Sequence, residues 1–192
     1  MTKTLNKFIR ILIYSDLALL SGIGFMAPVF AIFLTDNIKG GGVEVAGFAA
    51  AIYWIIKSIV IIPIGTYLDR KPSEKVDLWF IVGGNILVAA STFGYIFSSL
   101  PWHIYLFEAI YGLGVAMNVP GYTAIFTRHI SSGKEATSWS VKTAIDGIGS
   151  GIAGALGGLV AASFGFAALF VGVGILTLIS ALLPLFILNE LE

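Results

Sequence analysis

The chain has 192 residues, of which 57% are hydrophobic and only 11% charged, and its mean hydropathy is +0.94. Soluble domains carry roughly 25% charged residues, so this composition excludes a water-soluble globular domain and indicates an integral membrane protein. Eleven basic residues balance eleven acidic ones and cysteine is absent, which excludes a strongly basic nucleic-acid-binding protein and any site built on thiolates.

Six apolar stretches are long enough to cross a bilayer as helices, because about 20 residues span its hydrocarbon core. The linkers between them are short and rich in glycine, proline and charged residues, so they leave no room for a soluble domain. We expect one all-α transmembrane domain over residues 1–192. Its helices are predicted over about 9–34, 45–67, 76–98, 101–126, 137–163 and 166–188.

Basic residues gather at the linkers on one side of this predicted arrangement, and only Lys39 lies on the other side. Segments rich in lysine and arginine stay in the cytoplasm, so both termini are predicted to be cytoplasmic and the protein to be a multi-pass protein of the plasma membrane. The basic residues on the cytoplasmic side are Lys3, Lys7, Arg10, Arg70, Lys71, Lys75, Arg128 and Lys134.

The first and fourth predicted helices share a pattern of two glycines one residue apart, then a proline, then Ala-Ile-Phe. An acid, Asp16 or Glu108, precedes each pattern. The two helices run in opposite directions, which predicts two inverted three-helix repeats, with chance similarity among apolar helices as the alternative. The pattern comprises Gly22, Gly24, Pro28 and 31–33 in the first helix, and Gly112, Gly114, Pro120 and 124–126 in the fourth.

Residues 65–71 read Gly-Thr-Tyr-Leu-Asp-Arg-Lys, which is similar to the first half of the signature G-x-x-x-D-R/K-x-G-R-R/K of the major facilitator transporters, although residues 72–74 replace its second half. Glu108 and Tyr111 stand where the R-x-x-Q-G pattern of helix 4 has arginine and glutamine. Residues 149–158 resemble the antiporter pattern G-x-x-x-G-P-x-x-G-G, and residues 25–30 resemble helix 1 of drug and proton antiporters.

This resemblance implies a six-helix half of a major facilitator transporter, similar to the N-terminal half of drug:proton antiporters. It implies secondary active transport of a small solute by alternating access, with no enzymatic activity, cofactor or metal, and with protons or another ion as possible coupling partners. Because the family has twelve helices in two halves, two copies are expected to form a homodimer. The alternatives are a substrate-binding membrane subunit of a larger transporter and a truncated or non-transporting half.

Five ionisable residues lie well inside the predicted spans, where a charge costs a few kcal/mol, and they are the candidates for transport and proton coupling. Lys57 lies at mid-membrane and is expected to have an acidic partner or to face an aqueous cavity. Lys142 and Asp146, one helical turn apart, bind solute or only neutralise each other. Proton coupling is expected through Glu108 or Asp16, the latter with Ser15, Tyr14 or water as possible hydrogen-bonding partners. The five candidates are Asp16, Lys57, Glu108, Lys142 and Asp146.

A polar stripe on the fourth predicted helix follows the 3,4,3,4 spacing of one helical face. We expect it to line a water-filled path, with hydrogen bonding between helices as the alternative. Trp54, which lies deep in the second helix, is expected to line the same cavity. The stripe consists of Glu108, Tyr111, Val115, Asn118 and Tyr122.

The signature segment is predicted to gate the cytoplasmic side through Gly65, Asp69 and Arg70. An acid at a helix C-terminus needs positive charge nearby, so Asp69 is expected to meet Arg70, a lysine or the N-terminus of another helix. In the resembled fold that helix belongs to the opposite half, which places residues 138–139 of a second copy near Asp69.

In the fifth helix, four glycines form a small-residue face expected to allow close helix packing: Gly147, Gly151, Gly154 and Gly158.

Overall fold

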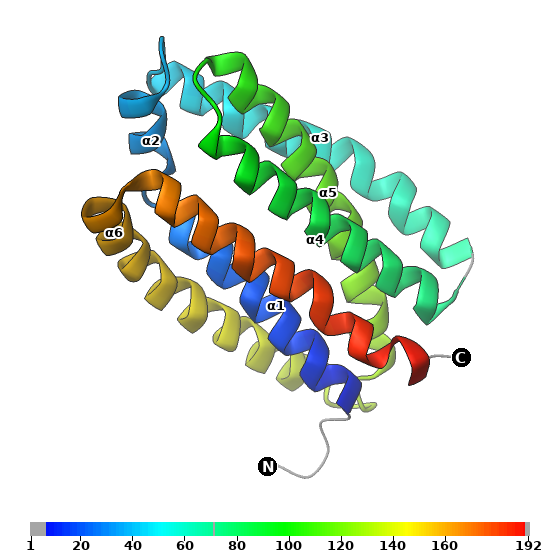
Figure 1. Ribbon diagram of the computed structural model, residues 1–192. Helices are drawn as coiled ribbons and strands as arrows, with labels where there is room; N and C mark the ends of the chain where they lie inside the picture. The colour runs from blue at the N-terminus through cyan, green and yellow to red at the C-terminus, as the bar shows by residue number, and fades with distance from the viewer. Residues whose placement is uncertain (1–6, 71, 191–192) are drawn as a thin grey trace.

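A computed structural model describes residues 7–70 and 72–190, and all regular structure in those residues is helical (Figure 1). By length and composition, α1, α3, α4 and α5 could each cross a membrane, and so could α6 together with η1. The predicted all-α membrane fold is thereby confirmed. The elements are α1 (Lys7–Met26), α2 (Phe30–Asn37), α3 (Val43–Arg70), α4 (Glu74–Ile96), α5 (Pro101–Arg128), α6 (Glu135–Leu182) and the 3-10 helix η1 (Leu183–Glu190).

Helix α6 is a hairpin of two antiparallel arms. Gly165 has φ 82° and ψ 168°, a backbone conformation that interrupts the helix and that a side chain would strain. At this turn the ribbon reverses, and the two arms of α6 run in opposite directions with α1 between them in the view of Figure 1. The first arm (residues 135–164) and the second arm (residues 166–182) correspond to the fifth and sixth predicted spans.

The first predicted span, 9–34, is broken into α1 and α2 at residues 27–29. Pro28 lies in this break, and proline ends helices because it lacks an N–H and its ring crowds the preceding turn. Pro63 and Pro120 lie inside α3 and α5 without ending them. Prolines in membrane helices are tolerated where neighbouring groups satisfy the freed carbonyls.

The helices alternate in direction, so one end of the bundle carries the starts of α1, α4 and α6 and the ends of α3 and α5. We call this the basal end; it lies toward the lower right of Figure 1. Lys3 and Lys71, which contribute to the predicted charge asymmetry, lie outside the described residues. The main packing pairs are α1 with α6, α4 with α5, α3 with α5 and α4 with α6.

The opening helix of each three-span repeat packs against the other repeat. A methyl group on Gly24 of α1 would lie 2.7 Å from the carbonyl oxygen of Ser150 in the first arm of α6. In the same way, a methyl group on Gly112 of α5 would lie 2.7 Å from the carbonyl oxygen of Tyr53 in α3. The repeated glycine pattern therefore marks equivalent close crossings in two interlocked, inverted repeats.

The glycine face predicted on the fifth span is corrected by these contacts. Among the described residues, a Cβ atom on Gly147, Gly151 or Gly158 would meet no atom within 4 Å, whereas one on Gly154 would lie 3.4 Å from the carbonyl oxygen of Gly24. Helical spacing alone could not identify the packed face, because glycines occur on two sides of this arm. The glycines that pack against α1 are Gly149, Gly154 and Gly157.

Candidate functional site

A half-buried lysine joins two buried carboxylates in the basal half of the bundle. Lys142 Nζ lies 2.5 Å from Asp16 Oδ2 of α1 and 2.6 Å from Asp146 Oδ2, one turn further along α6. The ammonium also lies 5.0 Å from the centre of the Tyr122 ring of α5, within the range of a cation–π contact. Three helices thus bring together residues that the sequence had suggested separately. We call Asp16, Lys142, Asp146 and Tyr122 the acid–lysine cluster.

The acid–lysine cluster has unused hydrogen-bonding capacity. Asp146 Oδ1 and Tyr122 Oη are buried and have no hydrogen-bond partner among the described residues. Two carboxylates face one ammonium, and a buried unpaired charge is costly. The arrangement is chemically suited to accept one further proton or small cation.

Ser15 and Tyr14 do not hydrogen-bond Asp16, contrary to one of the expectations from the sequence. Ser15 Oγ donates to the backbone oxygen of Ser180, 2.7 Å away in the second arm of α6, and Tyr14 is exposed. The positive partner of Asp16 is Lys142 instead. This contact joins distant parts of the chain, so no local pattern could reveal it.

Glu108 forms a second acidic site, nearer the opposite end of the bundle. Its Oε1 accepts a hydrogen bond of 2.9 Å from Tyr95 Oη of α4. Glu108 is 7% exposed and Tyr95 is fully buried. Among the described residues, Glu108 has no ion pair, so a tyrosine hydroxyl is the main polar group facing it.

Lys57 lies near this site but is not paired with Glu108. Its Nζ lies 4.5 Å from the Trp54 ring and 5.6 Å from the Tyr53 ring, and the Tyr53 ring contacts Tyr111 at 5.6 Å. Trp54 is 58% exposed on α3. Access of Lys57 and Glu108 to one water-filled cavity stays a prediction, as does the role of Trp54 in lining it.

The polar stripe of α5 is buried in this conformation. Tyr111, Asn118 and Tyr122 are 6%, 4% and 4% exposed, and Val115 is buried beside them. Asn118 Nδ2 donates to Asn85 Oδ1 of α4 at 2.7 Å, which is a hydrogen bond between helices. A water-filled path along the stripe would therefore require a different conformation of the bundle.

Asn118 belongs to a buried chain of hydrogen bonds that the sequence did not predict. Asn85 Nδ2 donates to Ser180 Oγ at 2.8 Å, and Ser180 Oγ lies 3.2 Å from Ser15 Oγ. Because the Ser15 hydroxyl donates to the Ser180 backbone, the Ser180 hydroxyl is the donor between the two serines. The chain connects α5, α4, α6 and α1. Polar residues within apolar helices were the only signal for Asn85 and Ser180.

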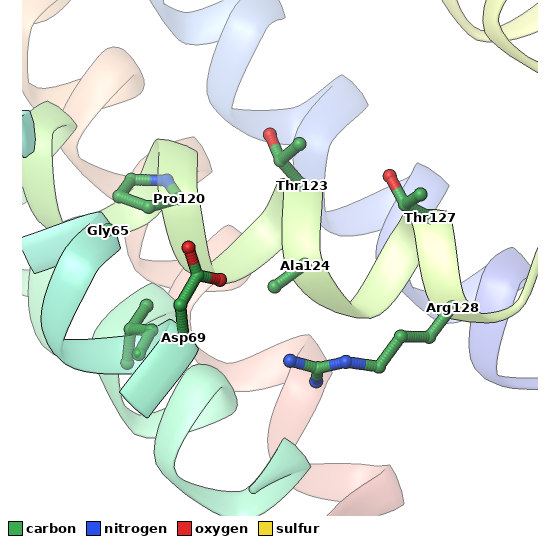
Figure 2. Close-up of a pocket in the computed structure, with 8 residues that line it drawn as sticks. Gly65, Asp69, Pro120, Thr123, Ala124, Thr127 and Arg128 are labelled. Carbon is green, nitrogen blue, oxygen red and sulfur yellow. The ribbon is translucent and has the colours of Figure 1, made fainter. Parts of the chain in front are cut away.

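A pocket of about 460 Å³ opens between α3 and α5 at the basal end (Figure 2). We call it the basal pocket. Asp69 and Gly65 belong to its α3 wall, and Asp69 forms no ion pair or hydrogen bond through its side chain with the described residues. Arg70 ends α3 and is exposed, and it does not line the pocket. The lining residues are Gly65, Leu68, Asp69, Pro120, Thr123, Ala124, Thr127 and Arg128.

An ion pair between α5 and α4 supports one wall of the basal pocket. Arg128 Nη1 donates to Asp77 Oδ2, and the Asp77 side chain is fully buried. Asp77 and Arg128 were not among the predicted site residues, because each lies near a helix end where a solvent-exposed charge is ordinary. Their pairing depends on the α4–α5 packing.

These features define a multi-pass helical membrane protein with inverted three-span repeats and two buried acidic sites inside its spans. Comparison with protein families matches residues 17–192 to the Major Facilitator Superfamily. Because the match covers most of the chain, the protein belongs to this superfamily of membrane transporters, as the sequence motifs predicted. A search of curated proteins finds no match.

Proposed function

We propose that the chain is a secondary active transporter of a small solute that works by alternating access, with protons as the coupling ion. The observation that carries this proposal is the acid–lysine cluster, in which Asp16 and Asp146 share Lys142 inside a membrane domain. Ionisable groups are costly there and usually serve a solute or ion pathway. Glu108, held by Tyr95, is the second candidate for binding the coupling proton.

We propose further that this transporter is a homodimer in the cytoplasmic membrane, with both termini in the cytoplasm. The basal end would then be cytoplasmic, in keeping with the excess of lysine and arginine there. Asp69 lies exposed in the basal pocket without an ionic partner among the described residues, and the start of α6 lies at the same end. A two-fold axis along the membrane normal would bring Asp69 of each subunit to the start of the other subunit's α6.

The described helix boundaries refine this contact. Helix α6 begins at Glu135 rather than at residue 137, and the Ser138 N–H donates to the carbonyl oxygen of Lys134 at 2.9 Å. The free amides of the helix start are therefore those of its first turn, residues 135–137. The Trp139 ring packs against Phe126 of its own chain, 4.9 Å between ring centres. We place the amides of residues 135–137, rather than residues 138–139, opposite Asp69.

Transport can be tested by reconstituting the purified protein in liposomes with an imposed pH gradient. Organic cations, sugars and carboxylates would be added as separate solute panels, and an internal pH-sensitive dye would report proton flux. Flux that depends on a solute and on the protein supports the proposal. Proton-independent accumulation of a solute would reject proton coupling but keep transport, and copurification with an ATPase would favour the subunit of a larger transporter.

A further inference from the structure

The basal pocket presents opposite charges on its two walls. Asp69 extends from α3 and Arg128 from α5, and Figure 2 shows both side chains at the opening between the helices. Arg128 is fixed, because leaving Asp77 would strand a fully buried carboxylate. Its side chain is nevertheless 34% exposed, and among the described residues only Nη1 has a hydrogen-bond partner. The guanidinium therefore has further N–H donors for a second anion.

The start of α6 carries a complementary pair of charges. Its first-turn N–H groups are the positive end of the helix dipole, and Glu135 is the acid of the first turn. Gly133 N–H donates to Glu135 Oε1 at 3.0 Å, which holds this exposed carboxylate at the helix start. A positive and a negative group thus lie side by side at the basal end.

We propose that Arg128 binds the partner subunit's Glu135 in the basal pocket, while Asp69 faces the partner's first-turn amides. This contact rests on the proposed homodimer and adds to it a second, oppositely charged pair. Two complementary pairs would fix the orientation of the inserted helix, whereas Asp69 alone would accept many angles. We assign the occupant as a second copy of this chain. The basal pocket and the start of α6 that would fill it both lie at the basal end of the same chain, as a two-fold interface requires.

The apolar faces of α3 and of the first arm of α6 also support a second copy as the occupant. Helix α3 leads to Asp69 with large exposed apolar side chains, and the first arm of α6 leads away from Glu135 with another exposed apolar face. Packing α3 of one subunit along the first arm of α6 of the other would cover both. The exposed apolar residues are Phe48, Ile55, Ile59 and Ile62 on α3, and Ile148, Ile152, Leu156 and Leu159 on α6.

Crosslinking tests the proposed proximity directly, because the chain contains no cysteine. Thr127→Cys lies in the pocket wall and Ala136→Cys lies beside Glu135; both positions are exposed. Differently tagged subunits, one carrying each cysteine, would be coexpressed and treated with a short bifunctional thiol reagent in membranes. We expect a mixed crosslinked dimer. The control replaces Ala136→Cys with Ser99→Cys, at the opposite end, and should give none.

A double-mutant cycle tests the charge pair itself. Glu135→Gln should weaken dimerisation in liposomes about two- to fivefold, the range of an exposed ion pair. The same change should have no effect in the Asp77→Asn/Arg128→Gln background, which removes the guanidinium without leaving a buried carboxylate unpaired. Arg128→Lys keeps the charge and should keep most of the effect. Dimerisation would be measured by energy transfer between labelled subunits over a range of protein-to-lipid ratios.

The outcomes separate this inference from the homodimer. A monomer at every protein-to-lipid ratio would overturn both. A dimer in which positions 127 and 136 crosslink no better than 127 and 99 would overturn the pocket contact alone. If that crosslink forms but Glu135→Gln weakens both backgrounds equally, the helix start occupies the pocket without the Arg128–Glu135 pair, and the proposal is wrong.

Discussion

The carboxylate of Asp16 and the ammonium of Lys142 lie 2.5 Å apart, although α1 and the first arm of α6 come from opposite halves of the chain. This ion pair fixes the basal half of the glycine-lined crossing between these helices. Because Lys142 also binds Asp146, one cation compensates two buried acids.

Neutralising Lys142 alone should therefore destabilise the fold more than neutralising Lys142 together with both carboxylates. We expect Lys142→Met to lower the free energy of unfolding by about 3–5 kcal/mol, because two buried carboxylates lose their counter-charge. The triple variant Asp16→Asn/Lys142→Met/Asp146→Asn should be closer to the parent. Tryptophan fluorescence during unfolding in detergent would measure both, and equal destabilisation would show that the carboxylates are not dependent on Lys142.

Charge removal at Glu108 and Lys57 should impair coupled flux, because neither residue can face lipid at low cost. We expect Glu108→Gln and Lys57→Ala each to abolish most solute-dependent proton flux in liposomes. Tyr95→Phe, which removes the hydrogen bond to Glu108 but keeps the carboxylate, should retain part of it. Should Glu108→Gln and Lys57→Ala transport like the parent, the pathway does not use this region.

The buried chain of hydrogen bonds should contribute to stability. Asn85 binds both Asn118 and Ser180, so Asn85→Leu leaves the buried Asn118 amide without its partner and removes one of the two hydrogen bonds of the Ser180 hydroxyl. Hydrogen bonds between membrane helices average about 0.6 kcal/mol, so we expect a loss of about 1–2 kcal/mol. A double-mutant cycle with Asn118→Leu would measure the coupling, and strict additivity would mean that the two amides do not interact in the bilayer.

Two glycines of similar helical setting should respond differently to a methyl group. Gly24→Ala would push a methyl group against the backbone of Ser150, and overpacking of this kind costs about 1–3 kcal/mol. A methyl group on Gly151 would meet no atom of the described residues within 4 Å, so Gly151→Ala should not lower the melting temperature of the monomer. If the two variants melt alike, the α1–α6 crossing is looser than described.

Hydropathy predicted the spans and the glycine pattern predicted their inverted order, because both depend on properties repeated along each helix, and the partial signature motifs predicted the family. The partners of Asp16 and Arg128 depend instead on which helices meet, and no local pattern encodes that. The α5 stripe shows the same limit. Polar spacing identifies a face that avoids lipid, but Asn118 satisfies that requirement equally by facing water or by binding Asn85. The prolines show the same limit for the backbone. Pro28 lies in the break between α1 and α2, whereas Pro120 lies inside the continuous helix α5.

The interlocking of the two repeats also sets an order of events during biosynthesis. Asp16 enters the membrane with the first helix, but its counter-ion Lys142 belongs to a helix made much later. At ~5–20 residues per second, ribosomes need on the order of ten seconds to reach it. During that interval α1 carries an acid and a glycine-lined face that lack their partners on α6, and we expect the insertion machinery to shield them. A ribosome that stalls after α5 would leave an intermediate whose first helix lacks its main packing partner, α6, and membrane proteases could recognise that exposed surface.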